Sequence, residues 1–167
     1  MNTILTDFVF DVDGVFTTGQ FLYTSEGKFA KIFGPHDSDG IKAIKEHIRI
    51  SAISADARGF SITKKRIEGD MGIPLSLVSE SDRMDHFAKT YAPEKTIYMA
   101  DGIHDVPLLQ MVAYGIAPQS AYPAAKEASD YVTSLRAGEG AVAEACYHVL
   151  EKFFTIQIKN ISLWQTK

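Results

Sequence analysis

Short apolar runs alternate with longer segments of helical spacing along most of the 167-residue chain. Short apolar runs between turn residues are typical of buried strands, and apolar residues three or four positions apart are typical of helices. The expected strands are 5–10, 48–53, 75–78, 96–99, 114–116 and 131–132. The expected helices are 40–47, 59–69, 83–91, 105–112, 121–128 and 140–153. This alternation predicts an α/β fold, a Rossmann-like, doubly wound parallel sheet with helices on both faces.

The segment 16–33 interrupts the alternation and predicts a β-hairpin inserted after the first strand. Residues 19–23 and 28–33 alternate aromatic and charged side chains, and Ser25-Glu26-Gly27 supplies a turn between them. An exposed hairpin of this kind has an apolar face that a lone domain buries with difficulty, so we expect self-association. We expect one domain over residues 1–167, with a C-terminal tail at 154–167.

Charge and hydropathy narrow the classes of partner. The net charge is -4 and no basic stripe is visible, which argues against a nucleic-acid partner. No apolar segment is long enough to span a bilayer, and Met1 is not followed by the pattern of a signal peptide. We therefore expect a cytoplasmic protein without a membrane partner. Cys146 is the only cysteine, so no intrachain disulfide can form, and its helical context predicts buried packing.

Two aspartates, Asp11 and Asp13, directly follow the first apolar run. Ligands of open parallel sheets bind beyond the carboxyl ends of the strands, and a spacing of two directs both side chains to one side unless Gly14 turns the chain. Adjacent carboxylates repel unless a cation is near, and hard oxygen ligands suit Mg²⁺. One carboxylate can attack phosphorus while the other acts as general acid and base. The competing interpretation is a pair of turn-capping aspartates.

Polar residues also follow other expected strands. Ser54 can donate to a phosphoryl oxygen, Arg83 can bind a transferring phosphoryl group, and Asp101, with Asp105 four residues later, can complete a magnesium site. Taken singly, Ser54 and the aspartates are common helix N-caps and Arg83 is a common surface residue. Because the carboxyl ends of parallel strands meet at one edge of a sheet, their joint occurrence predicts a site of magnesium-dependent phosphoryl transfer.

The segment Phe10-Asp11-Val12-Asp13-Gly14-Val15-Phe16-Thr17 resembles the opening DxDGVxT signature of the haloacid dehalogenase-like phosphohydrolases. The hairpin in place of a large cap domain resembles their capless branch. That branch holds the 3-deoxy-D-manno-octulosonate 8-phosphate phosphatases and the keto-deoxy nonulosonate (sialic-acid type) 9-phosphate phosphatases. Residues 37–41 and the stretches 130–133 and 138–142 also resemble segments of that branch, so the similarity covers about residues 5 to 152.

The resemblance implies a phosphatase that hydrolyses a phosphorylated acid sugar through an aspartyl-phosphate. Asp11 is then the nucleophile and Asp13 the general acid and base, with Mg²⁺ held by Asp11, the Asp13 backbone carbonyl and Asp101. Asp105 would orient the metal shell. Ser54, Arg83 and the backbone around Ala55 would bind phosphate. Members of the branch are typically homotetramers whose hairpins pack together, so the resemblance implies a tetramer.

The chain departs from the branch at four places. The usual Thr-Gly-Arg is Ser54-Ala55-Asp56, with the nearest cation at Arg58, and the usual phosphate-binding lysine is Arg83. Gly102 replaces an acidic residue, and Glu139 replaces an arginine. Asp37 is expected as a helix N-cap, and His36 as a loop histidine at the surface.

The lost cations leave a second interpretation open, a catalytically weak or inactive domain that assembles with a sugar-nucleotide synthetase. A phospho-accepting receiver domain is disfavoured, because its phosphorylated aspartate ends the third strand. Here that strand ends in Val78-Ser79-Glu80.

Overall fold

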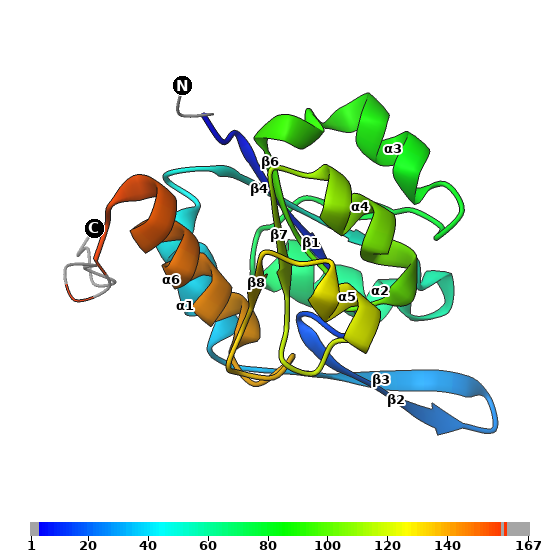
Figure 1. Cartoon of the computed structure of the whole chain (residues 1–167). Coiled ribbons are helices and arrows are strands. Elements are labelled where there is room, and N and C mark those ends of the chain that lie inside the picture. The colour runs from blue at the N-terminus through cyan, green and yellow to red at the C-terminus, as the bar shows by residue number, and fades with distance from the viewer. Residues whose placement is uncertain (1–3, 158, 160–167) are drawn as a thin grey trace.

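Six parallel strands form the central sheet of this computed structural model, which describes residues 4–157 and residue 159 (Figure 1). Across the sheet the strands are β5 (Leu75–Leu77), β4 (Arg49–Ser54), β1 (Asp7–Asp11), β6 (Thr96–Met99), β7 (Tyr114–Ala117) and β8 (Tyr131–Val132). The chain winds outward from β1 in both directions, so the strand order reverses between β1 and β6. Ligands of doubly wound sheets bind at this switch point. The predicted fold class is confirmed.

Helices cover both faces of the sheet, because every residue of β1 is buried and its successive side chains point to opposite faces. They are α1 (Asp37–Ile44) and α6 (Ala141–Phe154) on one face, and α3 (Arg83–Thr90), α4 (Val106–Met111) and α5 (Pro123–Glu127) on the other (Figure 1). Phe8 and Phe10 pack into the core beneath α1 and α6, whereas Val9 between them packs into the second core. Cys146 is fully buried in the first core, as predicted.

Helix α1 begins three residues earlier than its apolar spacing predicts, at Asp37 instead of Gly40. At Gly40 the helices α1 and α6 approach closely, because a Cβ added there would lie 2.5 Å from the Cα of Ala143. A side chain at this position would push the two helices apart.

The expected helix 59–69 is divided into three short segments. A 3-10 turn η1 (Ala57–Gly59) leads into α2 (Phe60–Lys64), which continues as the π-helical segment η2 (Lys65–Asp70). Two further 3-10 turns, η3 (Pro93–Lys95) and η4 (Ile103–Asp105), precede β6 and α4.

The predicted hairpin is confirmed as an antiparallel pair, β2 (Thr17–Thr24) and β3 (Gly27–Phe33), that forms a sheet of its own and projects from the domain (Figure 1). Of the predicted tail at 154–167, residue 158 and residues 160–167 lie outside the described part of the chain. Among the described residues, no helix combines the length and apolar character needed to span a membrane.

Candidate active site

The carboxyl ends of β1 and β6 meet at a cavity of about 340 Å³. Asp11 is the last residue of β1, and Asp101 follows β6 by two residues. Between Asp11 and the hairpin the backbone turns at Gly14, which has a φ of +83°. A Cβ at Gly14 would lie 2.0 Å from Oδ2 of Asp101, so the turn brings the chain against that carboxylate only because the residue is glycine.

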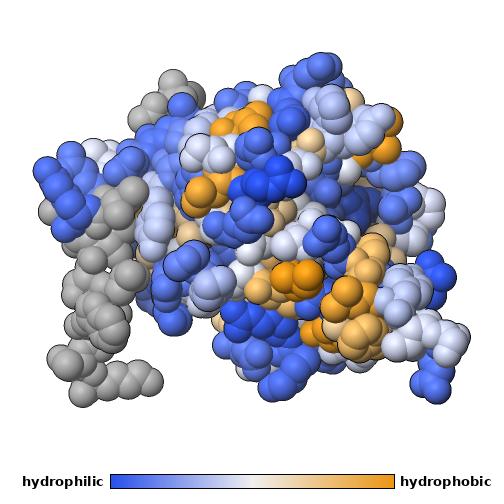
Figure 2. All heavy atoms as spheres, turned by 90° about the horizontal axis from the view of Figure 1, so that it is seen from below, coloured by the Kyte–Doolittle hydropathy of each residue, from blue (hydrophilic) through white to orange (hydrophobic). Residues whose placement is uncertain are grey.

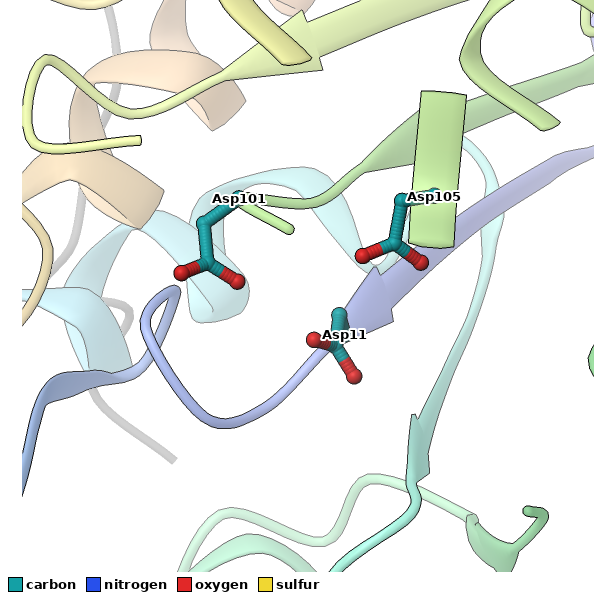
Figure 3. Close-up of side chains that lie close together, drawn as sticks. All are labelled: Asp11, Asp101 and Asp105. Atoms are coloured by element: carbon teal, nitrogen blue, oxygen red, sulfur yellow. The ribbon is translucent and has the colours of Figure 1, made fainter. Parts of the chain in front are cut away.

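Three carboxylates, those of Asp11, Asp101 and Asp105, converge at this edge of the sheet (Figure 3). One oxygen of each lies within 4.8 Å of the others. Asp105 reaches the group from η4, where its Oδ2 accepts a hydrogen bond of 3.3 Å from the backbone N–H of Gly102. Three anionic groups this close repel one another, and hard oxygen ligands at this spacing are suited to a divalent cation.

Burial, and then repulsion between the carboxylates, raises the pKa of two members of this cluster. Burial, together with the neighbouring Asp105 carboxylate, raises the pKa of Asp101 to about 7. Burial also raises the pKa of Asp11 well above its usual value, against the opposing effect of the Arg83 guanidinium. A bound cation would favour the ionised forms of both groups.

Arg83, the first residue of α3, is buried and lies between two of these carboxylates. One guanidinium nitrogen, Nη2, donates to Oδ1 of Asp11 at 3.3 Å, while Nη1 donates to Oδ1 of Asp105 and, at 3.3 Å, to the hydroxyl of Tyr98. Burial by itself disfavours the charge, but Asp11 and Asp105 outweigh it and raise the pKa of Arg83. The alternative of a solvated surface arginine is therefore wrong.

Asp13 lines the same cavity but is not one of the three clustered carboxylates, and its side chain pairs with Lys31. Its Oδ2 accepts a hydrogen bond of 3.3 Å from the hydroxyl of Ser54, which is fully buried at the end of β4. Ala55, the next residue, lines the cavity. The structure thus brings all seven predicted site residues to one end of the sheet.

Two hairpin lysines contact the site, and the sequence did not single them out. Lys31 lies 2.8 Å from a carboxylate oxygen of Asp13 and 2.8 Å from one of Asp56, and Lys28 also pairs with Asp56. Burial by itself would raise the pKa of Asp56, but the hydrogen bonds from these lysines lower it to about 2. Both lysines lie on β3. The alternation of apolar and charged residues predicted this strand, but it did not predict that its lysines contact the site.

The expectation that Asp37 caps its own helix is wrong. His36 is the N-cap residue of α1, and Asp37 is buried inside that helix with its Oδ1 accepting a hydrogen bond of 3.3 Å from the backbone N–H of Ala143. Asp37 therefore caps the beginning of α6 instead. His36 is exposed, as predicted, and lines a different cavity of about 590 Å³. Glu139 is also exposed and does not line the active-site cavity.

Comparison with known sequences finds a matching family and relatives of this chain. The model of the haloacid dehalogenase-like hydrolase family matches residues 84–145. A 3-deoxy-D-manno-octulosonate 8-phosphate phosphatase (KdsC) from Salmonella typhi is 30% identical over 145 residues, covering 83% of this chain and 75% of the relative.

Solved structures similar to this chain include phosphatases of the same name. The cobalt-bound deoxy-D-mannose-octulosonate 8-phosphate phosphatase of Haemophilus influenzae superposes with a TM-score of 0.76 at 29% identity, covering 88% of each chain. The 3-deoxy-D-manno-octulosonate 8-phosphate phosphatase of Moraxella catarrhalis, solved with magnesium, phosphate and the sugar, gives a TM-score of 0.77 at 25% identity. That match covers 88% of this chain and 86% of the relative.

Proposed function

The chain belongs to the haloacid dehalogenase-like phosphatases, and on that premise we propose that it removes phosphate from an acid sugar of the keto-deoxy octulosonate or nonulosonate type. One observation carries the proposal. Asp11 lies at the end of the central strand, in hydrogen-bond contact with the buried Arg83 guanidinium and beside Asp101 and Asp105. A nucleophile, a cation for the phosphoryl group and a set of metal ligands are thus held together.

The acidic cluster fits a divalent cation, for which we propose Mg²⁺. Asp11 and Asp101, with the backbone carbonyl of Asp13, would hold it. Both oxygens of Asp105 already accept hydrogen bonds, Oδ1 from Tyr98 at 2.6 Å and Oδ2 from Gly102, which suits a residue that orients the shell. The ion would supply charge neutralisation for a phosphate ester entering an acidic cavity.

We assign the chemical steps to two aspartates. The Asp11 carboxylate attacks phosphorus in line and forms an aspartyl-phosphate, while Asp13 gives its proton to the departing sugar oxygen. Asp13 then takes a proton from water, whose oxygen attacks the phosphorus of the intermediate, and Asp11 is regenerated as phosphate leaves. Arg83, the Ser54 hydroxyl and the backbone N–H groups near Ala55 would stabilise the equatorial oxygens.

The outer part of the cavity supports an anionic sugar as the substrate. Arg58 lines it, is exposed, and makes no ion pair with any residue the structure describes. Lys28 lines the same cavity and is already paired with Asp56. We therefore propose Arg58 as the cation that faces the carboxylate of the sugar.

A panel of phosphorylated eight- and nine-carbon keto-deoxy sugars, with neutral sugar phosphates for comparison, tests the proposal in the presence of Mg²⁺. We expect strong preference for an acid sugar, and complete loss of turnover and of acid-trapped phosphoenzyme in Asp11→Asn. Asp70→Asn makes the same chemical change at an exposed ion pair outside the cavity and should keep full turnover. Unchanged turnover in Asp11→Asn would refute the mechanism.

We also propose a homotetramer assembled through the hairpin. Phe21, Leu22, Tyr23, Phe29 and Ile32 are exposed by 39–58% on β2 and β3. Figure 2, which views the molecule from below, shows apolar side chains gathered toward this projecting part. Light scattering during size exclusion should give four chains for the wild type and fewer for Phe29→Glu.

The alternative of an inactive assembly domain was suggested by the acidic residue Asp56 in place of a cation. Two lysines neutralise Asp56, so this residue does not favour that alternative.

A further inference from the structure

The hairpin places a fully buried ammonium group, that of Lys31, beside Asp13. The side chain of Lys31 has no exposed surface, although it belongs to a strand that projects from the domain. A buried charge is costly unless it is paired and hydrogen-bonded. Lys31 meets this requirement with three partners, the carboxylates of Asp13 and Asp56 and the hydroxyl of Thr63 at 2.7 Å.

The packing around this ammonium is close. A Cβ added to Gly59 would lie 2.2 Å from Oδ2 of Asp56 and 2.7 Å from Cε of Lys31. The turn after β4 therefore comes against the lysine stem only because residue 59 has no side chain. This packing restricts where the Lys31 ammonium can lie.

Both oxygens of Asp13 lie against this ammonium. Oδ2 accepts hydrogen bonds from Lys31 at 2.9 Å and from the Ser54 hydroxyl at 3.3 Å. Oδ1 lies 2.8 Å from the same ammonium. Lys31 therefore holds the carboxylate as a whole, and Ser54 adds a donor to one of its oxygens.

We propose that Lys31 is a positioning residue for Asp13, its buried ammonium holding both carboxylate oxygens so that the group keeps a fixed orientation for proton transfer. The inference rests on the proposed function, in which Asp13 is the general acid and base. As the P–O bond breaks, the proton passes from Asp13 to the leaving oxygen, and the Asp13 carboxylate that remains stays paired with Lys31. Asp13 later takes a proton from water, while Lys31 remains an ammonium throughout.

The test compares leaving groups that need a proton with leaving groups that do not. Single-turnover release is measured for phenyl phosphate and 4-nitrophenyl phosphate, with the enzyme in excess and Mg²⁺ present. Phenolate is a poor leaving group without protonation, whereas 4-nitrophenolate departs unaided. In Lys31→Met we expect the rate with phenyl phosphate to fall at least about tenfold more than the rate with 4-nitrophenyl phosphate.

Comparison of Lys31→Met with Asp13→Asn separates the positioning role of Lys31 from the acid role of Asp13. Asp13→Asn should change the ratio of the two rates in the same direction and by more. An unchanged ratio in Asp13→Asn overturns the acid role of Asp13 and with it the proposed mechanism. A changed ratio in Asp13→Asn with an equal loss on both substrates in Lys31→Met overturns the positioning role alone.

Lys28→Met is the matched control, because Lys28 lies on the same strand and contacts Asp56 but makes no ion pair with Asp13. Its ratio should equal that of the wild type, and a shift as large as that of Lys31→Met would overturn the proposal. Where circular dichroism shows that Lys31→Met does not fold, Thr63→Val removes one acceptor from the ammonium and keeps both charges. There we expect a smaller shift in the same direction, and an unchanged ratio overturns the proposal.

Discussion

Gly14 lies so close to Asp101 that a Cβ at residue 14 would be 2.0 Å from the carboxylate oxygen. Gly14→Ala must therefore displace Asp101, in addition to straining a backbone with a φ of +83°. Because the displaced carboxylate belongs to the metal cluster, we expect Mg²⁺ affinity, measured by calorimetry, to fall by at least about tenfold.

Gly72→Ala separates displacement from strain. Gly72 has a φ of +69° and no neighbouring atom within 4 Å of an added Cβ. This variant should lose about 1 kcal/mol of stability and no metal affinity. Equal metal affinities for the two variants would contradict the displacement of Asp101.

Metal binding should depend on pH through the acidic cluster. Without metal, burial and the neighbouring Asp105 raise the pKa of Asp101 to about 7, so this carboxyl holds a proton at pH 6 that a cation must displace. The apparent affinity for Mg²⁺ should rise between about pH 6 and pH 8 and then level off. Calorimetry in buffers of different ionisation enthalpy should detect released protons at pH 6 and few at pH 8.5. An affinity independent of pH would show that the carboxyl is already ionised.

Arg83 should stabilise the metal-free protein as well as bind phosphate. Arg83→Met leaves Asp11 and Asp105 without their buried cation, which should cost on the order of 3 kcal/mol of unfolding free energy. Mg²⁺ should restore part of this loss, so the metal-induced rise in Tm should be larger than in the wild type. Arg58→Met, at an exposed arginine of the same cavity, should leave stability within about 0.5 kcal/mol. A smaller metal-induced rise in Tm in Arg83→Met would contradict the idea that Arg83 and Mg²⁺ both neutralise these carboxylates.

Asp37 should make stability fall as pH rises from about 4 to 6. Burial raises its pKa from 3.8 to about 6, so the native state binds the proton more tightly than the unfolded chain. The stabilisation from protonation is complete below pH 3.8 and is lost as pH passes 6, about 3 kcal/mol in all.

Asp37→Asn keeps an oxygen to accept the N–H of Ala143 and removes the ionisation. The variant should therefore gain stability over the wild type between pH 4 and 6.5, as measured by urea unfolding. Asp39→Asn, at a carboxylate exposed by 49%, should follow the wild type at every pH. Parallel curves for Asp37→Asn and the wild type would refute the effect.

The placement of Asp11, Ser54, Arg83 and Asp101 was predictable, because each ends or follows a strand of a parallel sheet whose carboxyl ends share one edge. The contact between Lys31 and Asp13 was not. Alternation along a hairpin says which residues share a face, but not against which surface that face packs.

The role of Asp37 was missed for a related reason. Its helix begins before the first apolar residue of the periodic pattern, and this turns a predicted cap into a buried side chain. Tyr98 appeared only as part of an apolar strand, yet its hydroxyl donates to Asp105. The periodicity of apolar residues predicts helices and strands, whereas the contacts between side chains of different elements depend on how those elements pack.

The central place of β1 also determines when the site can form during synthesis. Asp11 leaves the ribosome early, but β1 pairs with β4 and β6, so Asp7 finds one neighbour in Arg49 and the other only in Thr96. Until β6 has emerged, one edge of this fully buried strand has no partner. A pause in translation before β6 would therefore prolong the time during which nascent chains can pair with one another instead of closing their own sheet.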